Sequence, residues 1–90
     1  MLLTKKVFEL IISMGDNMKE EELYSMSDVF RISDVGSYSN VCTMLYNLEA
    51  KGLVTCEEDK YKSSITRVAL TRTGREVYKL LKEIDNKIKV

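Results

Sequence analysis

The sequence has no histidine, no proline and no tryptophan, and its 90 residues include only two cysteines, Cys42 and Cys56. A structural zinc site normally needs four nitrogen or sulfur ligands, which one such chain cannot supply. Without histidine, the commonest general base and the Cys–His and Ser–His nucleophile pairs are also missing. We therefore expect a protein that is not an enzyme and that holds neither a metal ion nor another cofactor.

Long apolar runs are missing too. None approaches the ~20 residues of a transmembrane helix. The first residues lack the basic region, apolar core and small-residue cleavage site of a signal peptide. We therefore expect a cytoplasmic protein with no membrane partner. In that compartment disulfides are rare and free cysteine commonly packs as a small hydrophobic residue, so we expect Cys42 and Cys56 to be structural. A redox switch is the alternative.

Net charge is also zero, because fourteen basic residues balance fourteen acidic ones. Strong net positive charge, the usual mark of a nucleic-acid-binding protein, is therefore not present. The charges are unevenly distributed, however. Residues 1–36 contain four basic and seven acidic residues, whereas residues 37–75 contain six basic and four acidic residues. The positive excess lies in the second of these segments.

The whole sequence is 44% hydrophobic and 31% charged, which is typical of a globular chain and not of a disordered one. We predict a single domain over residues 1–90. A domain this small buries only about 60% of the surface of its unfolded chain, so a dimer interface would add stability.

Apolar residues at helical spacing predict two helices in the first part of the chain. The first covers about residues 3–14, with Gly15 expected to end it. The second covers about residues 20–32. Two start positions are possible for this helix, because Asn17 with Glu20 and Ser25 with Asp28 could each form a capping box. Its predicted buried stripe is Leu23, Met26, Val29, Phe30 and Ile32.

A third helix is predicted over residues 38–50, with Ser37 as its N-cap and Gly52 after its end. Two strands, residues 53–57 and 65–70, then follow with a polar loop between them. Thr71 caps a last helix over residues 72–88, whose apolar stripe is Val77, Leu81, Ile84 and Ile88.

Two helices with a short turn between them, followed by a hairpin and a helix, predict a winged helix-turn-helix. The fold class is mainly α with a small β-hairpin wing.

Two short motifs carry a family resemblance. Residues 48–54, Leu-Glu-Ala-Lys-Gly-Leu-Val, resemble the join between recognition helix and wing in MarR-type and PadR-type transcription regulators. Residues 70–76, Leu-Thr-Arg-Thr-Gly-Arg-Glu, resemble the join between the wing and the closing helix of these regulators. The resemblance covers about residues 23–81. The compactness of the chain is also similar to that of small winged-helix proteins of archaea and their viruses.

The resemblance implies a homodimeric, sequence-specific regulator that binds double-stranded DNA. It would pair through the terminal helices, about residues 3–14 and 72–88. Helix 38–50 would lie in the major groove, and wing 57–65 would lie on the backbone or in the minor groove. This chain departs from MarR-type wings at residues 62–64, Lys-Ser-Ser, where those wings usually carry an Asp-Arg-x-Arg-like tip. It is also shorter than most MarR proteins, and a small-molecule effector is not predicted.

The candidate DNA contacts are side chains that can bond to base edges or phosphates. They are Tyr38, Ser39, Asn40, Thr43, Tyr46 and Asn47 on the third helix, Lys60, Lys62 and Arg67 on the wing, and Arg72 at the start of the last helix. The third helix contains neither lysine nor arginine. The alternative function is therefore a winged-helix module that binds another protein and not DNA.

Overall fold

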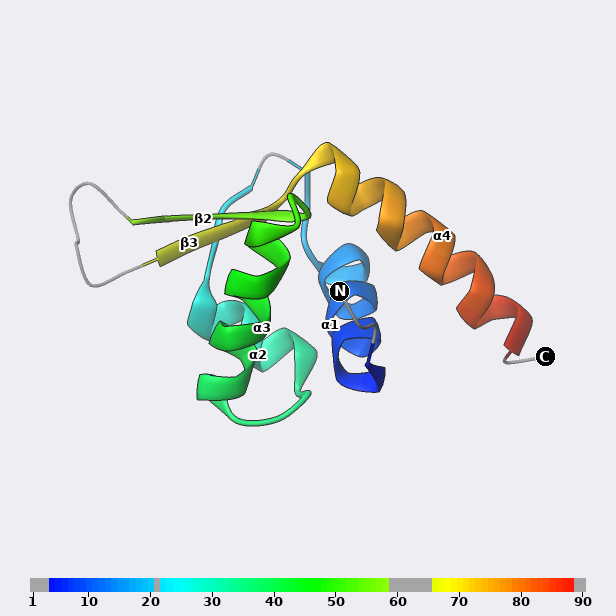
Figure 1. Ribbon diagram of the computed structural model, residues 1–90, viewed down its shortest axis with the longest axis horizontal. Coiled ribbons are helices and arrows are strands. Elements are labelled where there is room, and N and C mark those ends of the chain that lie inside the picture. The colour runs from blue at the N-terminus through cyan, green and yellow to red at the C-terminus, as the bar shows by residue number, and fades with distance from the viewer. Residues whose placement is uncertain (1–3, 21, 59–65, 89–90) are drawn as a thin grey trace.

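The computed structural model describes residues 4–20, 22–58 and 66–88. Within these residues the chain forms four helices and three short strands. The helices are α1 (Lys5–Asn17), α2 (Met26–Ser33), α3 (Tyr38–Ala50) and α4 (Arg72–Ile88), and the strands are β1 (Tyr24–Ser25), β2 (Val54–Glu58) and β3 (Thr66–Leu70). The β2–β3 hairpin extends to one side of the helices and α4 runs away on the other (Figure 1). The predicted winged helix-turn-helix is confirmed. None of the described helices has both the length and the hydrophobicity that a membrane crossing needs.

The sheet has one more strand than the sequence predicted. Its order is β1-β3-β2 and both pairings are antiparallel. The wing register runs from Val54 opposite Leu70 to Glu58 opposite Thr66. On the other edge of β3, Tyr24 lies opposite Val68 and Ser25 opposite Arg67. The base of the wing is therefore held inside a three-stranded sheet.

The predicted second helix, residues 20–32, is wrong in its first half. Helix α2 begins at Met26, because Ser25 is extended and forms a capping box with Asp28. The Asn17–Glu20 alternative is not used. Before α2 the chain pairs with β3 instead, and Leu23, predicted to be buried, is 56% exposed. A pairing partner far along the chain thus overrides the local helical pattern.

Helix α1 also differs from its prediction over residues 3–14. It begins after Thr4, whose hydroxyl accepts a hydrogen bond from the Val7 N–H at 3.2 Å, and it continues through Gly15 to Asn17. Gly15 is present for a packing reason. A Cβ at this position would lie 2.0 Å from a ring carbon of Tyr78 on α4. The glycine therefore allows α4 to approach α1 closely and does not end the helix.

The predictions for helices 38–50 and 72–88 are confirmed at both ends. The predicted strands 53–57 and 65–70 are observed as β2 and β3, with β2 displaced by one residue and residue 65 outside the described part of the chain. Gly52, after the end of α3, has a φ of +78°, a left-handed conformation that favours glycine.

The core lies where α1, α2, α3 and the sheet meet. Its fully buried side chains are Leu10, Ile11, Met14, Val29, Val41, Leu45, Leu48, Val54 and Val68. The predicted stripe of α4 divides into two parts. Val77 and Leu81 pack against the core, whereas Ile84 is 49% and Ile88 75% exposed in the single chain.

Candidate nucleic-acid interface

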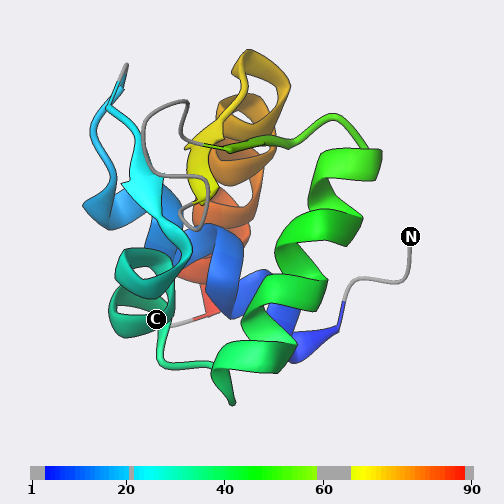
Figure 2. The same ribbon diagram turned by 90° about the vertical axis from the view of Figure 1, so that its left-hand side faces the viewer.

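Helix α3 turns one face into the core and the opposite face to solvent. Val41, Leu45 and Leu48 are completely buried. The six predicted contact residues of this helix are all exposed: Tyr38, Ser39, Asn40, Thr43, Tyr46 and Asn47. Figure 2 shows α3, in green, along the outer side of the molecule. The structure thus brings these six side chains together on one accessible helix.

Local hydrogen bonds fix the first turns of α3. The Ser37 hydroxyl accepts the Asn40 N–H at 3.2 Å, which satisfies one free donor of the helix start. The Thr43 hydroxyl donates to the Ser39 carbonyl at 3.1 Å, so its oxygen can still accept a hydrogen bond. The Tyr38 ring packs edge-on against Phe30, with ring centres 5.8 Å apart. A hydrogen bond with Cys42 raises the pKa of Tyr38 above its ordinary value.

The two sequence motifs meet in space and form one joint between α3, the wing and α4. The Leu53 carbonyl accepts the Thr71 N–H at 3.0 Å, and the Gly52 carbonyl accepts the Thr71 hydroxyl proton at 2.6 Å. The same hydroxyl accepts the Gly74 N–H at 3.0 Å and so caps α4. Gly74 lies so close that a Cβ would be 2.0 Å from the Leu53 carbonyl oxygen. This close approach explains the glycine at position 74 of the second motif.

Glu49, the acidic residue of the first motif, joins α3 to the wing. Its carboxylate accepts the backbone N–H of Cys56 on β2 at 2.9 Å. β2 is an edge strand, so this N–H faces away from β3 and would otherwise rely on solvent. The bond orients the wing relative to the exposed face of α3.

The predicted basic contacts are less concentrated than the α3 residues. Lys60 and Lys62 lie outside the described residues. Arg67 is half-buried on β3, opposite Glu57. Arg72 is 95% exposed, and its guanidinium lies 3.6 Å from Glu76 in the first turn of α4. Such an exposed pair is weak, so the Arg72 side chain is available to another anion.

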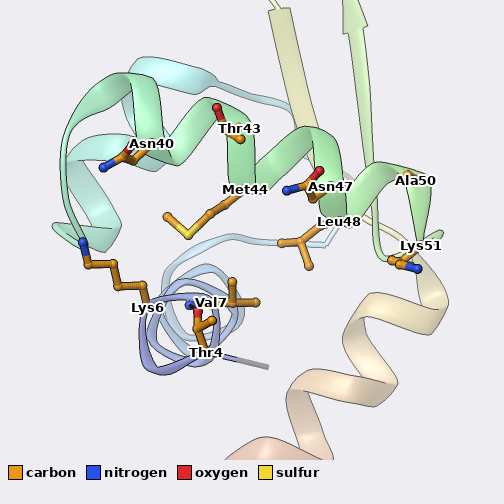
Figure 3. Close-up of a pocket in the computed structure, with 10 residues that line it drawn as sticks. All are labelled: Thr4, Lys6, Val7, Asn40, Thr43, Met44, Asn47, Leu48, Ala50 and Lys51. Carbon is orange, nitrogen blue, oxygen red and sulfur yellow. Dashed lines mark hydrogen bonds between the residues drawn. The ribbon is translucent and has the colours of Figure 1, made fainter. Parts of the chain in front are cut away.

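A groove beside α3 contains two lysines, Lys6 and Lys51, that are not among the predicted contacts. It has a volume of about 560 Å³ and lies between α3 and the first turn of α1. Its polar lining includes Thr4, Lys6, Asn40, Thr43, Asn47 and Lys51. Figure 3 shows the Lys6 ammonium reaching toward the turn before α3, while Lys51 lies at the opposite end of the helix. Lys6 adjoins the apolar stripe of α1, but the stripe does not reveal which element lies opposite.

The two cysteines are free and half-buried. Burial raises the pKa of the Cys56 thiol to about 11, with the nearby Glu49 charge acting in the same direction. The thiolate is the reactive form of cysteine and is therefore scarce at neutral pH. For Cys56 this environment favours the structural role over the redox switch.

The fold is similar to that of solved MarR-family regulators. Bordetella bronchiseptica BpsR, whose DNA binding is regulated by 6-hydroxynicotinic acid, matches 97% of this chain at 21% identity and a TM-score of 0.82. Staphylococcus aureus MepR in complex with DNA matches 97% at 16% identity and a TM-score of 0.80. Streptococcus pneumoniae FabT in complex with DNA matches 96% at 22% identity and a TM-score of 0.72.

This chain spans 62%, 61% and 57% of the lengths of these three proteins, so it corresponds to about three fifths of each. No model of a protein family matches the sequence. No curated protein sequence matches it either. At these identities the structural likeness establishes the winged-helix fold.

Proposed function

We propose that this protein is a sequence-specific double-stranded DNA-binding transcription regulator and not an enzyme. Helix α3 would lie in the major groove, whose width of about 12 Å admits one helix. The wing would follow the backbone or enter the minor groove. Phosphate contacts would set the register of the protein on the duplex, and the polar side chains of α3 would read the bases.

The observation that carries this proposal is the exposed polar face of α3. Asn40 and Asn47 present amides that can pair with adenine edges, and Ser39 and Thr43 present hydroxyls that can bond to bases or phosphates. The Glu49–Cys56 bond holds the wing beside this face. The BpsR, MepR and FabT structures support the proposal, because all three are described as DNA-binding proteins.

Selection of bound duplexes from a random pool tests this function. We expect enrichment of one sequence, with an affinity at least about a thousandfold above that for random duplex. Asn40→Ala should reduce this discrimination. Glu83→Ala, an exposed change on α4, should leave it unchanged. A pool that shows no enrichment at low salt would contradict the proposal.

The proposed assembly is a homodimer paired through the terminal helices. Its support is the apolar surface that the single chain leaves open, with Leu80 60%, Ile84 49% and Ile88 75% exposed on α4. Ile88 also lines a groove with Phe8 and Ile12 of α1. Two-fold pairing would cover this surface in both copies.

Sedimentation velocity at micromolar concentration tests the dimer. The wild-type chain should sediment as a dimer, and Ile84→Glu should convert it to a folded monomer by placing a charge in the apolar stripe. Glu83→Lys, a charge change at the adjacent exposed residue, is the matched control and should remain dimeric. A monomeric wild type would overturn the proposed assembly.

A second candidate function is a winged-helix module that binds another protein. It is favoured by one observation: α3 has no basic residue, and Tyr38 and Tyr46 are 46% and 50% exposed. Exposed tyrosines are common in protein interfaces. The duplex selection separates the two functions, since a protein-binding module would enrich no sequence.

A further inference from the structure

The groove between α1 and α3 lies on one flank of the proposed recognition helix, and the wing lies on the other. An α-helix advances by about 100° per residue, so Asn40 and Met44 share the flank that lines the groove. Glu49 faces the opposite flank, where it bonds to Cys56 of the wing. Figure 3 shows Met44 directed toward α1 and Thr43 directed away from it.

A helix in the major groove meets phosphates on both of these flanks. An α-helix with its side chains is about 10–12 Å wide, close to the groove width of about 12 Å. One phosphate backbone therefore passes along the wing and the other passes along α1. The wing has the predicted basic residues for the first backbone, whereas α3 itself has none for the second.

Lys6 is the basic side chain on the α1 flank. Its Nζ lies 3.7 Å from the position that a Cβ on Gly36 would take, and the Asn40 amide nitrogen lies 3.8 Å from the same point. The ammonium and the first exposed amide of α3 thus gather at the turn before the helix. The described residues that line this groove include two lysines and no carboxylate, so the groove favours an anion.

We infer that Lys6 contacts a DNA phosphate and thereby positions α3 in the major groove. This inference rests on the proposed function, to which it adds a third contact element, α1. A lysine–phosphate contact carries no sequence information, so Lys6 sets the register and Asn40 beside it reads a base. DNA would thus be held between Lys6 on one backbone and the wing on the other.

Lys19 provides a control at the other end of α1. It carries the same charge and is also exposed, but it follows the last turn of α1, whereas Lys6 lies in the first. A general effect of net charge would be the same for Lys19→Gln and Lys6→Gln. A direct phosphate contact requires Lys6 alone.

The experiment measures affinity for the selected duplex and for random duplex, by fluorescence anisotropy over a range of salt concentrations. Lys6→Gln should lower the slope of log affinity against log salt by about 0.9 per subunit and weaken binding about fivefold to tenfold per subunit near 0.1 M salt. The loss should be similar for both duplexes. Lys6→Arg should retain the wild-type slope, and Lys19→Gln should change neither slope nor affinity. Thermal denaturation should be unchanged in all three variants.

The outcomes separate this inference from the proposed function. A wild-type protein that binds duplex while Lys6→Gln behaves as Lys19→Gln overturns the Lys6 contact and leaves the function in place. A wild-type protein that binds no duplex overturns both. A loss confined to the selected duplex would also contradict the inference, because it would assign base recognition and not phosphate contact to Lys6.

Discussion

Two glycines show how one atom can decide the stability of this domain. Gly74 is buried in the first turn of α4, where a Cβ would lie 2.0 Å from the Leu53 carbonyl oxygen. Gly52 has a φ of +78°, and apart from its chain neighbours no described residue has an atom within 4 Å of its Cβ position. The first is constrained by space and the second by backbone conformation.

We expect Gly74→Ala to destabilise the domain, although alanine in a helix interior ordinarily gains about 1 kcal/mol over glycine. Collision with a backbone atom should reverse that sign, with a net loss of about 3 kcal/mol. Gly52→Ala should cost only the left-handed conformation, about 1 kcal/mol. Urea denaturation followed by circular dichroism measures both, and a stabilised Gly74→Ala would show that the joint is looser than described.

Glu49 supplies a second prediction at this scale. Glu49→Ala removes the acceptor of the Cys56 N–H and should reduce the free energy of unfolding by about 1 kcal/mol. Glu49→Gln retains an oxygen acceptor and should lose less. Amide hydrogen exchange is the specific measurement, since the Cys56 amide should exchange faster in the alanine variant. If the Cys56 amide exchanges equally fast in Glu49→Ala and Glu49→Gln, Glu49 does not bond to the wing.

At the scale of elements, a small polar cluster fixes α4 against α1. The Tyr78 hydroxyl donates to Asp16, and the Lys82 ammonium lies 3.1 Å from the same carboxylate. The Tyr78 ring covers Gly15, and the Arg75 guanidinium donates to the Met18 carbonyl at 3.3 Å. These contacts set the direction in which α4 leaves the domain (Figure 1).

This cluster predicts a loss of stability at high pH. The hydrogen bond to Asp16, together with burial, raises the pKa of Tyr78 from 10.0 to about 12. A raised pKa favours the neutral phenol in the folded state, so its contribution is complete below pH 10 and is lost as pH rises through 12. The stability advantage of the wild type over Tyr78→Phe should therefore shrink between these values in urea denaturation.

A constant difference for Tyr78→Phe would show that the hydroxyl is not bonded to Asp16 in solution. Absorbance of tyrosinate provides an independent check, because Tyr78→Phe should lack the transition near pH 12.

The helices whose bounds could be predicted from the sequence have a capping residue or a glycine next to their ends. Helix α3 has Ser37 before it and Gly52 after it, and α4 has Thr71 before it. The start of α2 was missed because two capping boxes fit the same pattern, and the choice depends on the pairing of β1 with β3. The sequence predicts that Gly15 ends a helix, because a glycine that ends a helix cannot be distinguished in sequence from one that leaves room for a tyrosine ring.

The same reasoning applies to the candidate site. The exposure of the six predicted α3 residues follows from helical periodicity around Val41, Leu45 and Leu48, and the sequence predicts it. Lys6 was not predicted, because its significance depends on α1 lying beside the first turn of α3. Contacts between elements far apart in the sequence are visible only in the folded structure.

At the scale of the whole molecule, the fixed direction of α4 determines how a dimer would meet DNA. A dimer paired through α4 would hold its two α3 helices at one separation, and half-sites about 34 Å apart match successive major grooves. In such a dimer the contacts of Asp16 and Arg75, which fix α4 within each chain, would keep that separation constant. The selected sequence should therefore be an inverted repeat with an invariant spacer.

We expect insertion of about five base pairs between the half-sites to reduce affinity to that of a single half-site, because it turns one groove away from its helix. Anisotropy with the original and the lengthened duplex measures the change. A duplex carrying five base pairs inserted outside the repeat is the control. Equal binding to the original and the lengthened duplex would show that the two subunits read DNA independently.

The pairing of β1 with β3 also has a consequence for how the chain folds. Tyr24 lies opposite Val68, almost half the chain length away, whereas the β2–β3 hairpin is local. The closure of so long a loop costs more entropy than a hairpin, and such contacts slow folding. We therefore expect β1 to pair with β3 after the local hairpin has formed. Completion of this small sheet would then report that the wing is already in place.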